Sequence, residues 1–265
     1  MTSRPIAMFD SGFGGLTVAR AVIDLLPTQD LVYFGDTGRY PYGSRPLAEV
    51  HDFAMQIGTM LRREHNAKLL VVACNTASAA ALDDLRAELD IPVVGVIEPG
   101  IIAASKASRT GRVGVIGTVG TIESGAYPSA VAQNGLTVEL TPCACPGFVE
   151  FVERGETDGP GVHVLAQRLL EPVIHAEVDT LLLGCTHYPY LARTIGDVMG
   201  REVVLVSSAD ETAFEVRRLL VEDGRPGRVG RRTFISSGDA SVFETIGRRL
   251  FGAELVGAKE HRWDV

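Results

Sequence analysis

The stretch LLVVACNTASA at residues 69–79 has a close counterpart in LLLGCTHYPYL at residues 181–191. Each is a short apolar run that ends in a cysteine, and small or polar residues follow at once. Such a run is typical of a parallel strand buried on both faces, and functional groups gather at the carboxyl ends of these strands. The pair therefore predicts a duplicated fold that places one thiol, Cys74 or Cys185, at an equivalent position in each half.

The rest of the chain continues the alternation of strand and helix. Strands are expected at 6–10, 31–36, 69–74, 92–97, 112–118, 136–143, 180–185, 201–208 and 231–238. Helices are expected at 16–26, 46–65, 77–89, 99–109, 121–134, 161–177, 209–222 and 239–251, with a polar loop at 146–160. This alternation predicts the α/β class: two doubly wound parallel-sheet domains related by pseudo-twofold symmetry, with the active site in the cleft between them. The last strand and helix fit either half.

Composition narrows the class of protein. The chain has 265 residues, of which 46% are hydrophobic and 22% charged, and its net charge is −8. This acidity argues against binding to nucleic acid or to an anionic membrane. No apolar run reaches the roughly 18 residues of a membrane span, and the N-terminal apolar stretch is too short for a signal peptide. A cytoplasmic protein is expected, in which the four cysteines stay reduced; none of their spacings matches a CxxC pair.

Glycines and residues with hydrogen-bonding side chains follow several of the predicted strands. They are Asp10, Ser11, Gly12, Asp36, Thr37, Tyr42, Gly43, Ser44, Asn75, Thr76, Thr118, Thr121, Thr186 and His187. Because the carboxyl ends of parallel strands meet at one edge of a sheet, these residues and the two thiols predict a polar pocket. A small ligand with carboxylate and ammonium ends suits such a pocket.

The turn DSGFGGLTV at 10–18 joins the first strand to its helix. It matches neither the GxGxxG dinucleotide fingerprint nor the P-loop. Two interpretations stay open: a tight turn alone, or an anion site built from backbone N–H groups at a helix N-terminus. The negative charge of Asp10 opposes a phosphate and favours an ammonium group or a role in proton transfer.

The four cysteines differ in their surroundings. A single cysteine at a strand end is usually a small core residue, and Cys143 and Cys145 fit that interpretation because prolines flank them. Cys185 is followed directly by Thr186 and His187. A neighbouring cation lowers the pKa of a thiol, so this sequence favours a reactive group.

Two thiols on opposite sides of a cleft have a specific chemical use. One thiolate can remove a proton from one face of a stereocentre while a thiol returns a proton to the other face. Cysteine suits both roles because its unperturbed pKa of about 8.5 lies near cellular pH. Cys74 and Cys185 would form this pair, and Asp10 and His187 would assist them.

Five motifs carry a resemblance that covers residues 9 to about 210 in order. They are FDSGFGGLTV (9–18), GDTGRYPYGSR (35–45), VVACNTASA (71–79), GVIGTVGTI (114–122) and LLLGCTHYPYL (181–191). Together they resemble the glutamate racemases, a cofactor-independent branch of the aspartate/glutamate racemase group. The resemblance implies interconversion of L- and D-glutamate, which supplies D-glutamate for peptidoglycan, without pyridoxal phosphate or metal.

The resemblance also implies roles for individual residues. The catalytic set is Cys74 and Cys185 as the acid/base pair, with Asp10, Glu153 and His187 in support. The substrate-binding set is Asp10, Ser11, Tyr42, Gly43, Asn75, Thr76, Thr118, Thr186 and His187. Cys74 with Asp10 would serve D-glutamate, and Cys185 with His187 would serve L-glutamate. The same resemblance implies a homodimer, with domains at 1–97 plus 208–265 and at 98–207.

One segment departs from the family pattern. The chain reads CPGFVEFVERG at 145–155, where the family commonly reads CPLFVPLVE. The acid Glu153 keeps its place, and Glu150 adds a second carboxylate. If the segment is helical, the two share a face, and either could serve the cleft. We favour Glu153.

Other functions remain open at this stage. A racemase of a related substrate, aspartate or a hydantoin, would need the same two thiols. A nucleotide- or phosphate-binding protein would use DSGFGG as its phosphate loop. A thiol redox protein would join Cys74 to Cys185, although the absence of CxxC spacing opposes it.

Overall fold

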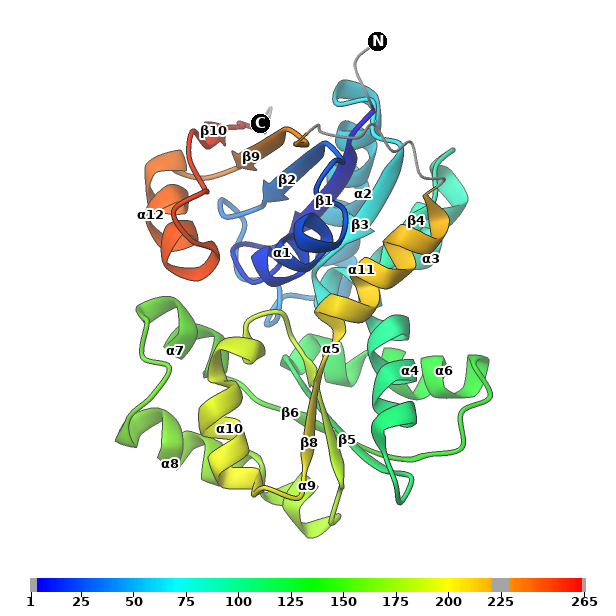
Figure 1. The fold of residues 1–265 in the computed structure, drawn as a ribbon, viewed down its shortest axis with the longest axis vertical. Coiled ribbons are helices and arrows are strands. Elements are labelled where there is room, and N and C mark those ends of the chain that lie inside the picture. The colour runs from blue at the N-terminus through cyan, green and yellow to red at the C-terminus, as the bar shows by residue number, and fades with distance from the viewer. Residues whose placement is uncertain (1–3, 221–228, 264–265) are drawn as a thin grey trace.

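The computed structural model describes residues 4–220 and 229–263, and within them two parallel sheets form two lobes (Figure 1). The first sheet has the order β10-β9-β2-β1-β3-β4 and the second β6-β5-β7-β8. The first comprises β1 (Ile6–Asp10), β2 (Leu31–Gly35), β3 (Leu69–Val72), β4 (Val93–Gly95), β9 (Arg232–Ser236) and β10 (Lys259–Glu260). The second comprises β5 (Arg112–Gly117), β6 (Glu139–Ala144), β7 (Thr180–Gly184) and β8 (Val204–Ser207). The predicted α/β class with two parallel-sheet domains is confirmed.

The two sheets share one strand order. The core of the first sheet runs β2-β1-β3-β4, and the second runs β6-β5-β7-β8, so each half uses its strands in the order second, first, third, fourth. Strand β3 therefore corresponds to β7. Cys74 lies two residues beyond β3, and Cys185 directly follows β7. The duplicated topology thus presents the two thiols at equivalent strand ends.

Helices cover both faces of the first sheet. On one face α1 (Leu16–Leu25), α11 (Ser208–Leu219) and α12 (Ala240–Phe251) pack on strand residues such as Met8 and Val71. On the other face α2 (Leu47–Glu64) and α3 (Asn75–Glu88) pack on residues such as Phe9 and Val72. Successive strand residues thus enter opposite cores, and this explains why the strands are continuous apolar runs.

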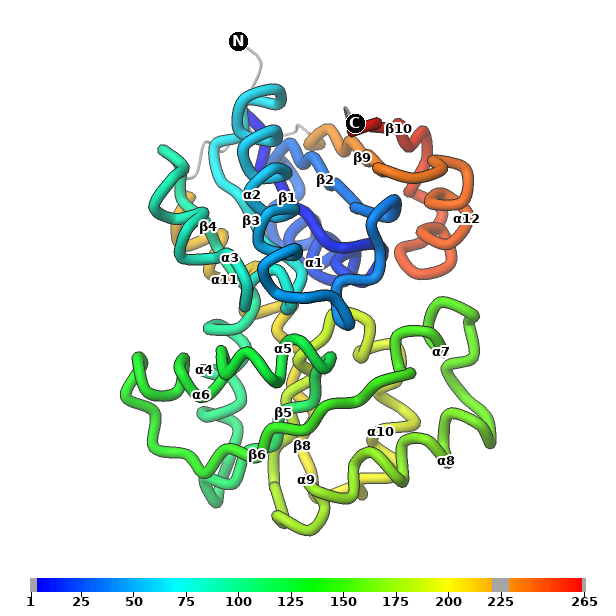
Figure 2. The backbone as a smooth tube through the Cα atoms, turned by 180° about the vertical axis from the view of Figure 1, so that it is seen from behind, coloured from blue at the N-terminus to red at the C-terminus, as the bar shows by residue number. Residues whose placement is uncertain are grey.

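The second sheet is covered in the same way. Helices α4 (Ile97–Ala107) and α6 (Ala126–Gln133), which lie side by side in Figure 2, pack on one face. The other face is covered by α7 (Phe148–Arg154), α8 (Pro160–Leu169), α9 (Glu171–His175) and α10 (Ala192–Met199). Two short elements, α5 (Val119–Glu123) and the 3₁₀ turn η1 (Tyr188–Leu191), follow β5 and β7. Both sheets are therefore doubly wound.

The chain passes between the lobes twice, at neighbouring points. The first crossing lies between Gly95 and Ile97, and the second lies where Ser207 meets Ser208. Helices α4 and α11, which follow these crossings, pack against each other. The carboxyl ends of the central strands of both sheets face each other across the junction.

Several predicted elements differ in the structure. The expected helix at 121–134 is two helices, α5 and α6, because Gly125 adopts a left-handed φ of 70° between them. The expected helix at 161–177 also divides, into α8 and α9, where Pro172 lacks the N–H that a continuous helix needs. The expected polar loop at 146–160 contains α7. Its buried Phe148 and Val152 are four residues apart and pack as one apolar stripe on the second sheet.

The last predicted strand and helix, which fitted either half, belong to the first sheet and its covering helices. The last predicted strand is β9, which pairs with β2, and β10 adds an edge strand that was not predicted. The final two residues of the expected helix at 209–222 lie outside the described residues. Within the described part of the chain, none of the helices combines the length and the apolar character that a membrane crossing requires.

Candidate active site

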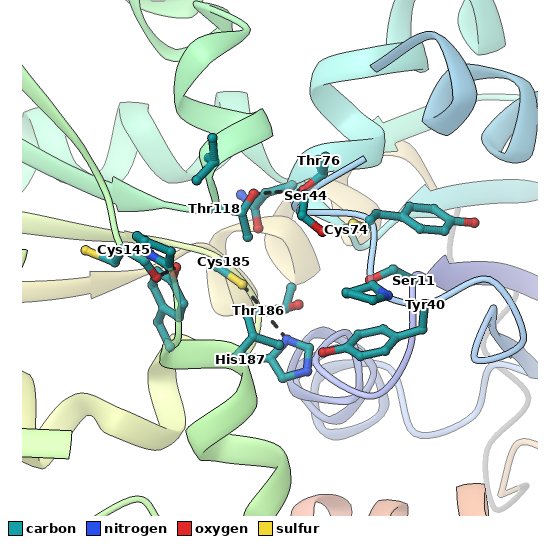
Figure 3. A pocket seen from close by; sticks show the side chains of 18 of the residues that line it. Ser11, Tyr40, Ser44, Cys74, Thr76, Thr118, Cys145, Cys185, Thr186 and His187 are labelled. Atoms are coloured by element: carbon teal, nitrogen blue, oxygen red, sulfur yellow. Dashed lines mark hydrogen bonds between the residues drawn. The ribbon is translucent and has the colours of Figure 1, made fainter. Parts of the chain in front are cut away.

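One pocket lies between the lobes, and it brings together most of the residues singled out by sequence. Figure 3 shows Cys74 and Cys185 reaching it from different lobes. The predicted residues that line it are Asp10, Ser11, Tyr42, Gly43, Ser44, Cys74, Asn75, Thr76, Thr118, Cys185, Thr186 and His187. The thiols are 5% and 6% exposed, so both sulfur-bearing side chains are buried at the pocket wall. All four cysteines of the chain are free thiols.

Cys74 is the N-cap of α3. Its Sγ atom accepts a hydrogen bond of 3.5 Å from the backbone N–H of Ala77, and it lies at the positive end of a helix of 14 residues. Burial and the nearby Asp10 carboxylate oppose this contribution and raise the pKa of Cys74 to about 12. Without a ligand, Cys74 is therefore a neutral thiol, ready to donate a proton.

Cys185 has a cation beside it. Its Sγ atom lies 3.9 Å from Nδ1 of His187, and Nε2 of the same ring lies 3.4 Å from a carboxylate oxygen of Glu153. Burial lowers the pKa of His187, but Cys185, Glu153 and Asp10 outweigh burial and raise it to about 10. His187 is thus an imidazolium near neutral pH and places a positive charge beside the sulfur atom of Cys185.

Asp10 links the two lobes. It ends β1, is 1% exposed, and accepts hydrogen bonds from the Gly12 N–H at 2.8 Å and from the Thr186 hydroxyl at 3.4 Å. Burial raises the pKa of Asp10, while the positive charge of His187 acts in the opposite direction. A buried carboxylate with these partners suits a role in moving a proton near Cys74 or in holding an ammonium group.

Hydroxyl groups connect the lobes on the other side of the pocket. The hydroxyls of Thr76, Thr118 and Thr121 lie within 2.9 to 3.1 Å of one another, and Thr76 belongs to a different lobe from the other two. Beside them, the amide nitrogen of Asn75 donates to the hydroxyl of Tyr127 at 2.9 Å. The carbonyl oxygen of the same amide is buried and has no hydrogen-bond partner among the described residues. This oxygen is available to a donor on a ligand.

The loop after β2 lines the pocket with the predicted residues Tyr42 and Gly43. The Tyr42 hydroxyl donates to the buried carboxylate of Asp36, so it does not serve as a donor to a ligand. Tyr40, which sequence reasoning missed, lines the pocket, and its ring lies 6.4 Å from the ring of His187. Burial and the negative charge of Glu153 raise the pKa of Tyr40, which keeps its hydroxyl protonated. Tyr40 lies within the motif GDTGRYPYGSR, but its partners His187 and Glu153 belong to the other lobe and are found only in the structure.

The two acids of α7 occupy different places. The Glu153 side chain is 20% exposed and lies behind His187, whereas Glu150 is exposed and lines the mouth of the pocket. Of the two acids, Glu153 is the one in contact with His187, and its role as an assistant stays a prediction. Cys145 also lines the pocket, but its contact with Cys143 and its burial raise its pKa strongly, so it stays protonated.

The glycine-rich turn after β1 meets the opposite lobe. A Cβ atom added to Gly14 would lie 2.4 Å from both His187 Nδ1 and Thr186 Oγ1. A Cβ atom on Gly15 would lie 2.6 Å from the Cβ atom of Asp10. The turn therefore needs glycine so that the first lobe can approach His187 and Thr186 of the second.

The pocket is too small and too acidic for a nucleotide. Its volume is about 90 Å³, against roughly 300–1,000 Å³ for pockets that enclose drug-sized ligands. Among the described residues that line it there is no lysine or arginine, and the side chains include the acids Asp10 and Glu150. A small zwitterion that binds through hydrogen bonds fits this site better than a polyphosphate.

Comparison with known proteins agrees with this arrangement. The family model described as Asp/Glu/Hydantoin racemase matches residues 17–214. A glutamate racemase from Parafrankia sp. (strain EAN1pec) is 51% identical over 96% of this chain and 93% of that protein. The crystal structure of glutamate racemase isoform RacE1 from Bacillus anthracis superposes with a TM-score of 0.92 at 39% identity, covering 100% of this chain and 99% of that one.

A further solved structure carries a ligand. The glutamate racemase from Francisella tularensis, in complex with D-glutamate, has a TM-score of 0.89 at 30% identity, and the match covers 97% of each chain. The two-lobed fold, the pocket with two thiols and these similarities all point to the same family. The chain belongs to the Asp/Glu/hydantoin racemase family and, within it, to the glutamate racemases.

Proposed function

We propose that this chain interconverts L- and D-glutamate by transferring protons at Cα between two thiols. The observation that carries the proposal is the position of Cys74 and Cys185 at equivalent strand ends around one shared pocket. Relatives named glutamate racemase at about half sequence identity, and the complex of one neighbour with D-glutamate, support glutamate as the substrate.

The reaction moves one proton out and one proton in. The Cys185 thiolate, stabilised by the His187 imidazolium, removes the Cα proton of L-glutamate and becomes a thiol. The Cys74 thiol gives its proton to the opposite face of Cα and becomes a thiolate, which leaves D-glutamate. The reverse reaction starts with Cys74 as the thiolate and Cys185 as the thiol. Cys74 then acts as the base, and Asp10 assists its deprotonation.

The pocket binds an acidic substrate through neutral donors. The N-terminus of α3 at Asn75 and Thr76 and the backbone of Gly43 supply N–H groups for carboxylates. Asp10 supplies a negative charge for the ammonium group. We also assign substrate contacts to the side chains of Ser11, Thr118 and Thr186 and to the backbone of Tyr42, because its hydroxyl is bound to Asp36.

Circular dichroism of D-glutamate incubated with the purified protein tests the proposal. We expect the optical signal of D-glutamate to decay to zero without any added cofactor, and D-aspartate to remain unchanged. In D₂O, deuterium should appear at Cα of the product. A signal that stays constant with D-glutamate would contradict the proposed function, and decay with D-aspartate alone would transfer it to the related substrate.

A nucleotide-binding function lacks support. The small acidic pocket opposes it, and calorimetric titration with ATP should give no heat of binding. A redox function would require a Cys74–Cys185 disulfide, whereas both residues are free thiols in this structure.

Other features of the proposal concern the whole protein. We propose domain limits of 1–97 plus 208–265 and 98–207, which follow the sheet membership and the two crossings. Residues 1–3, 221–228 and 264–265 within these limits lie outside the described residues. We further propose a cytoplasmic homodimer that supplies D-glutamate for peptidoglycan. The molar mass of the purified protein, measured by light scattering, tests the homodimer. A bacterial strain that lacks the gene should need added D-glutamate to grow if the protein supplies it.

A further inference from the structure

Asp36 is a fully buried carboxylate that lies just beyond β2 and does not line the pocket. One of its oxygens accepts hydrogen bonds from Arg39 Nε at 2.7 Å and from the Tyr42 hydroxyl. The other accepts from Ser237 Oγ at 2.6 Å and from the indole N–H of Trp263 at 3.2 Å. A buried charge is tolerated where donors surround it in this way, so removing one donor weakens the stabilisation of the carboxylate.

Arg39 strengthens the same cluster. Its guanidinium carbon lies 4.1 Å from the ring centre of Phe53 and 4.2 Å from that of Trp263, and its NH1 group donates to Gln56 at 2.7 Å. The cation is thus placed between two aromatic faces, an arrangement that is favourable for arginine. Trp263, near the C-terminus, therefore contacts both charged members of the cluster.

The cluster lies directly behind the substrate loop, residues 36–46. This loop supplies Tyr40, Pro41, Tyr42, Gly43 and Ser44 to the pocket. Its start is fixed where Asp36 accepts a backbone hydrogen bond from Arg39 at 3.1 Å, and its middle is fixed by the Tyr42 hydroxyl. Its end reaches the other lobe, where Gly43 accepts from the Gly120 N–H at 3.0 Å. Asp36 and its donors thus hold the loop on the side away from the ligand.

We propose that Trp263 is a positioning residue for the substrate: through Asp36 and Arg39 it holds the substrate loop in the shape that binds glutamate. The C-terminal tail, more than 200 positions from the loop, then forms part of the support of the active site. The proposal rests on the proposed racemase function. It does not place Trp263 in contact with the reacting atoms.

Steady-state kinetics of tail variants test the proposal. Trp263→Ala removes the N–H donor and the ring, and we expect KM for both enantiomers to rise about tenfold while kcat changes little. Trp263→Phe keeps a ring over Arg39 and should give an intermediate KM. The matched control is Arg262→Ala, which changes an exposed neighbour that pairs with Glu260 and should retain the wild-type KM.

The division between KM and kcat separates positioning from general damage. A variant that merely unfolds in part has fewer active molecules, so its apparent kcat falls while KM is unchanged; that outcome would overturn the proposal. An unchanged KM with unchanged kcat in Trp263→Ala would also overturn it. Because L- and D-glutamate have equal free energies in water, kcat/KM must fall by the same factor in both directions, which provides an internal check.

The wild-type protein offers a second measurement that does not depend on a variant folding. Trp263 is the only tryptophan of the chain, so its fluorescence reports on this cluster alone. We expect addition of D-glutamate to change the emission in a saturable way, with a midpoint near KM, and D-aspartate to leave it unchanged. Emission that is constant up to saturating D-glutamate would contradict the coupling.

These outcomes also separate the two proposals. Failure of the wild-type protein to racemise glutamate would refute the proposed function, whatever Trp263 does. Normal racemisation by the wild-type protein together with a normal KM in Trp263→Ala would refute only the positioning role.

Discussion

The Nδ1 atom of His187 lies 3.9 Å from the Sγ atom of Cys185, while the Nε2 atom of the same ring faces Glu153 at 3.4 Å. Although burial opposes the charge, these neighbours and Asp10 raise the pKa of His187 to about 10. The ring is therefore a buried cation between a sulfur atom and a carboxylate. In the proposed reaction it faces the sulfur atom that exchanges the proton of L-glutamate, and its charge also contributes to the stability of the folded protein.

The pKa of His187 predicts a pH-dependent stability. Because folding raises it from 6.5 to about 10, the protonated ring favours the folded state. This contribution is fully present below pH 6.5 and is lost as the pH rises through about 10. The free energy of unfolding of wild type should therefore exceed that of His187→Gln most near pH 6.5, and the difference should shrink toward pH 10. Urea unfolding of both proteins across this range measures it; a difference independent of pH would contradict the assignment.

Asp10 and Cys74 predict a change in thiol reactivity. Burial and the Asp10 carboxylate raise the pKa of Cys74 to about 12, so Asp10→Asn removes the second cause and should lower that pKa. The alkylation of Cys74 by iodoacetamide should then begin at lower pH, although racemisation becomes slower by about 10²-fold or more. Peptide mass analysis follows the alkylated site.

The alkylation is compared in two proteins that share the substitution Cys185→Ser, one with Asp10 and one with Asn at position 10. Of the two thiols in the pocket that are proposed to be catalytic, only Cys74 can then react. If the pH midpoint of alkylation is the same with Asp10 and with Asn, the carboxylate does not act on Cys74 as we describe.

The sequence predicted the pocket because its main components sit at strand ends. In a parallel sheet, continuous apolar runs identify the strands, and their carboxyl ends converge by topology alone. Cys74 and Cys185 could therefore be placed together although neither neighbours the other in sequence. The same logic failed for α7, whose apolar stripe of Phe148 and Val152 is short and follows a proline and a glycine.

Contacts between lobes could not be predicted in this way. Tyr40 contacts Glu153 and His187 only when the lobes are docked, and the need for glycine at position 14 is seen only when His187 lies opposite.

The contact of Trp263 was also beyond prediction. Trp263 reaches the substrate loop through a tail whose strand, β10, is only two residues long. Two residues are too few for any periodic pattern to identify.

Single replacement of each catalytic thiol predicts a separation of two half-reactions. Cys74→Ser and Cys185→Ser should each lower racemisation by about 10²- to 10⁴-fold or more, because a serine hydroxyl is a far weaker acid than a thiol. In D₂O, Cys185→Ser should still exchange the Cα proton of D-glutamate through Cys74, without inversion. Cys74→Ser should exchange only that of L-glutamate. NMR and chiral chromatography follow exchange and inversion.

A third thiol serves as the control. Cys143→Ser changes a buried sulfur that donates to the Leu169 carbonyl at 3.0 Å and does not line the pocket. Its rate should remain near that of wild type. Full racemisation by either catalytic variant would refute the two-thiol mechanism, and exchange of the opposite enantiomer would reverse the assignment of the two faces.

The contact of Gly14 with the opposite lobe predicts a loss of rate without a loss of fold. In Gly14→Ala the new Cβ atom would lie 2.4 Å from both His187 Nδ1 and Thr186 Oγ1, so the ring must turn or the lobes must separate. The backbone of Gly14 is not left-handed, so alanine fits it without strain. Since a misplacement of about 1 Å costs about 10²-fold in rate, kcat should fall by that order while far-ultraviolet circular dichroism is unchanged. Gly196→Ala on α10, where the nearest atom is 3.7 Å away, is the matched control and should keep the wild-type kcat. A wild-type kcat in Gly14→Ala would mean that the lobes do not need this close approach for catalysis.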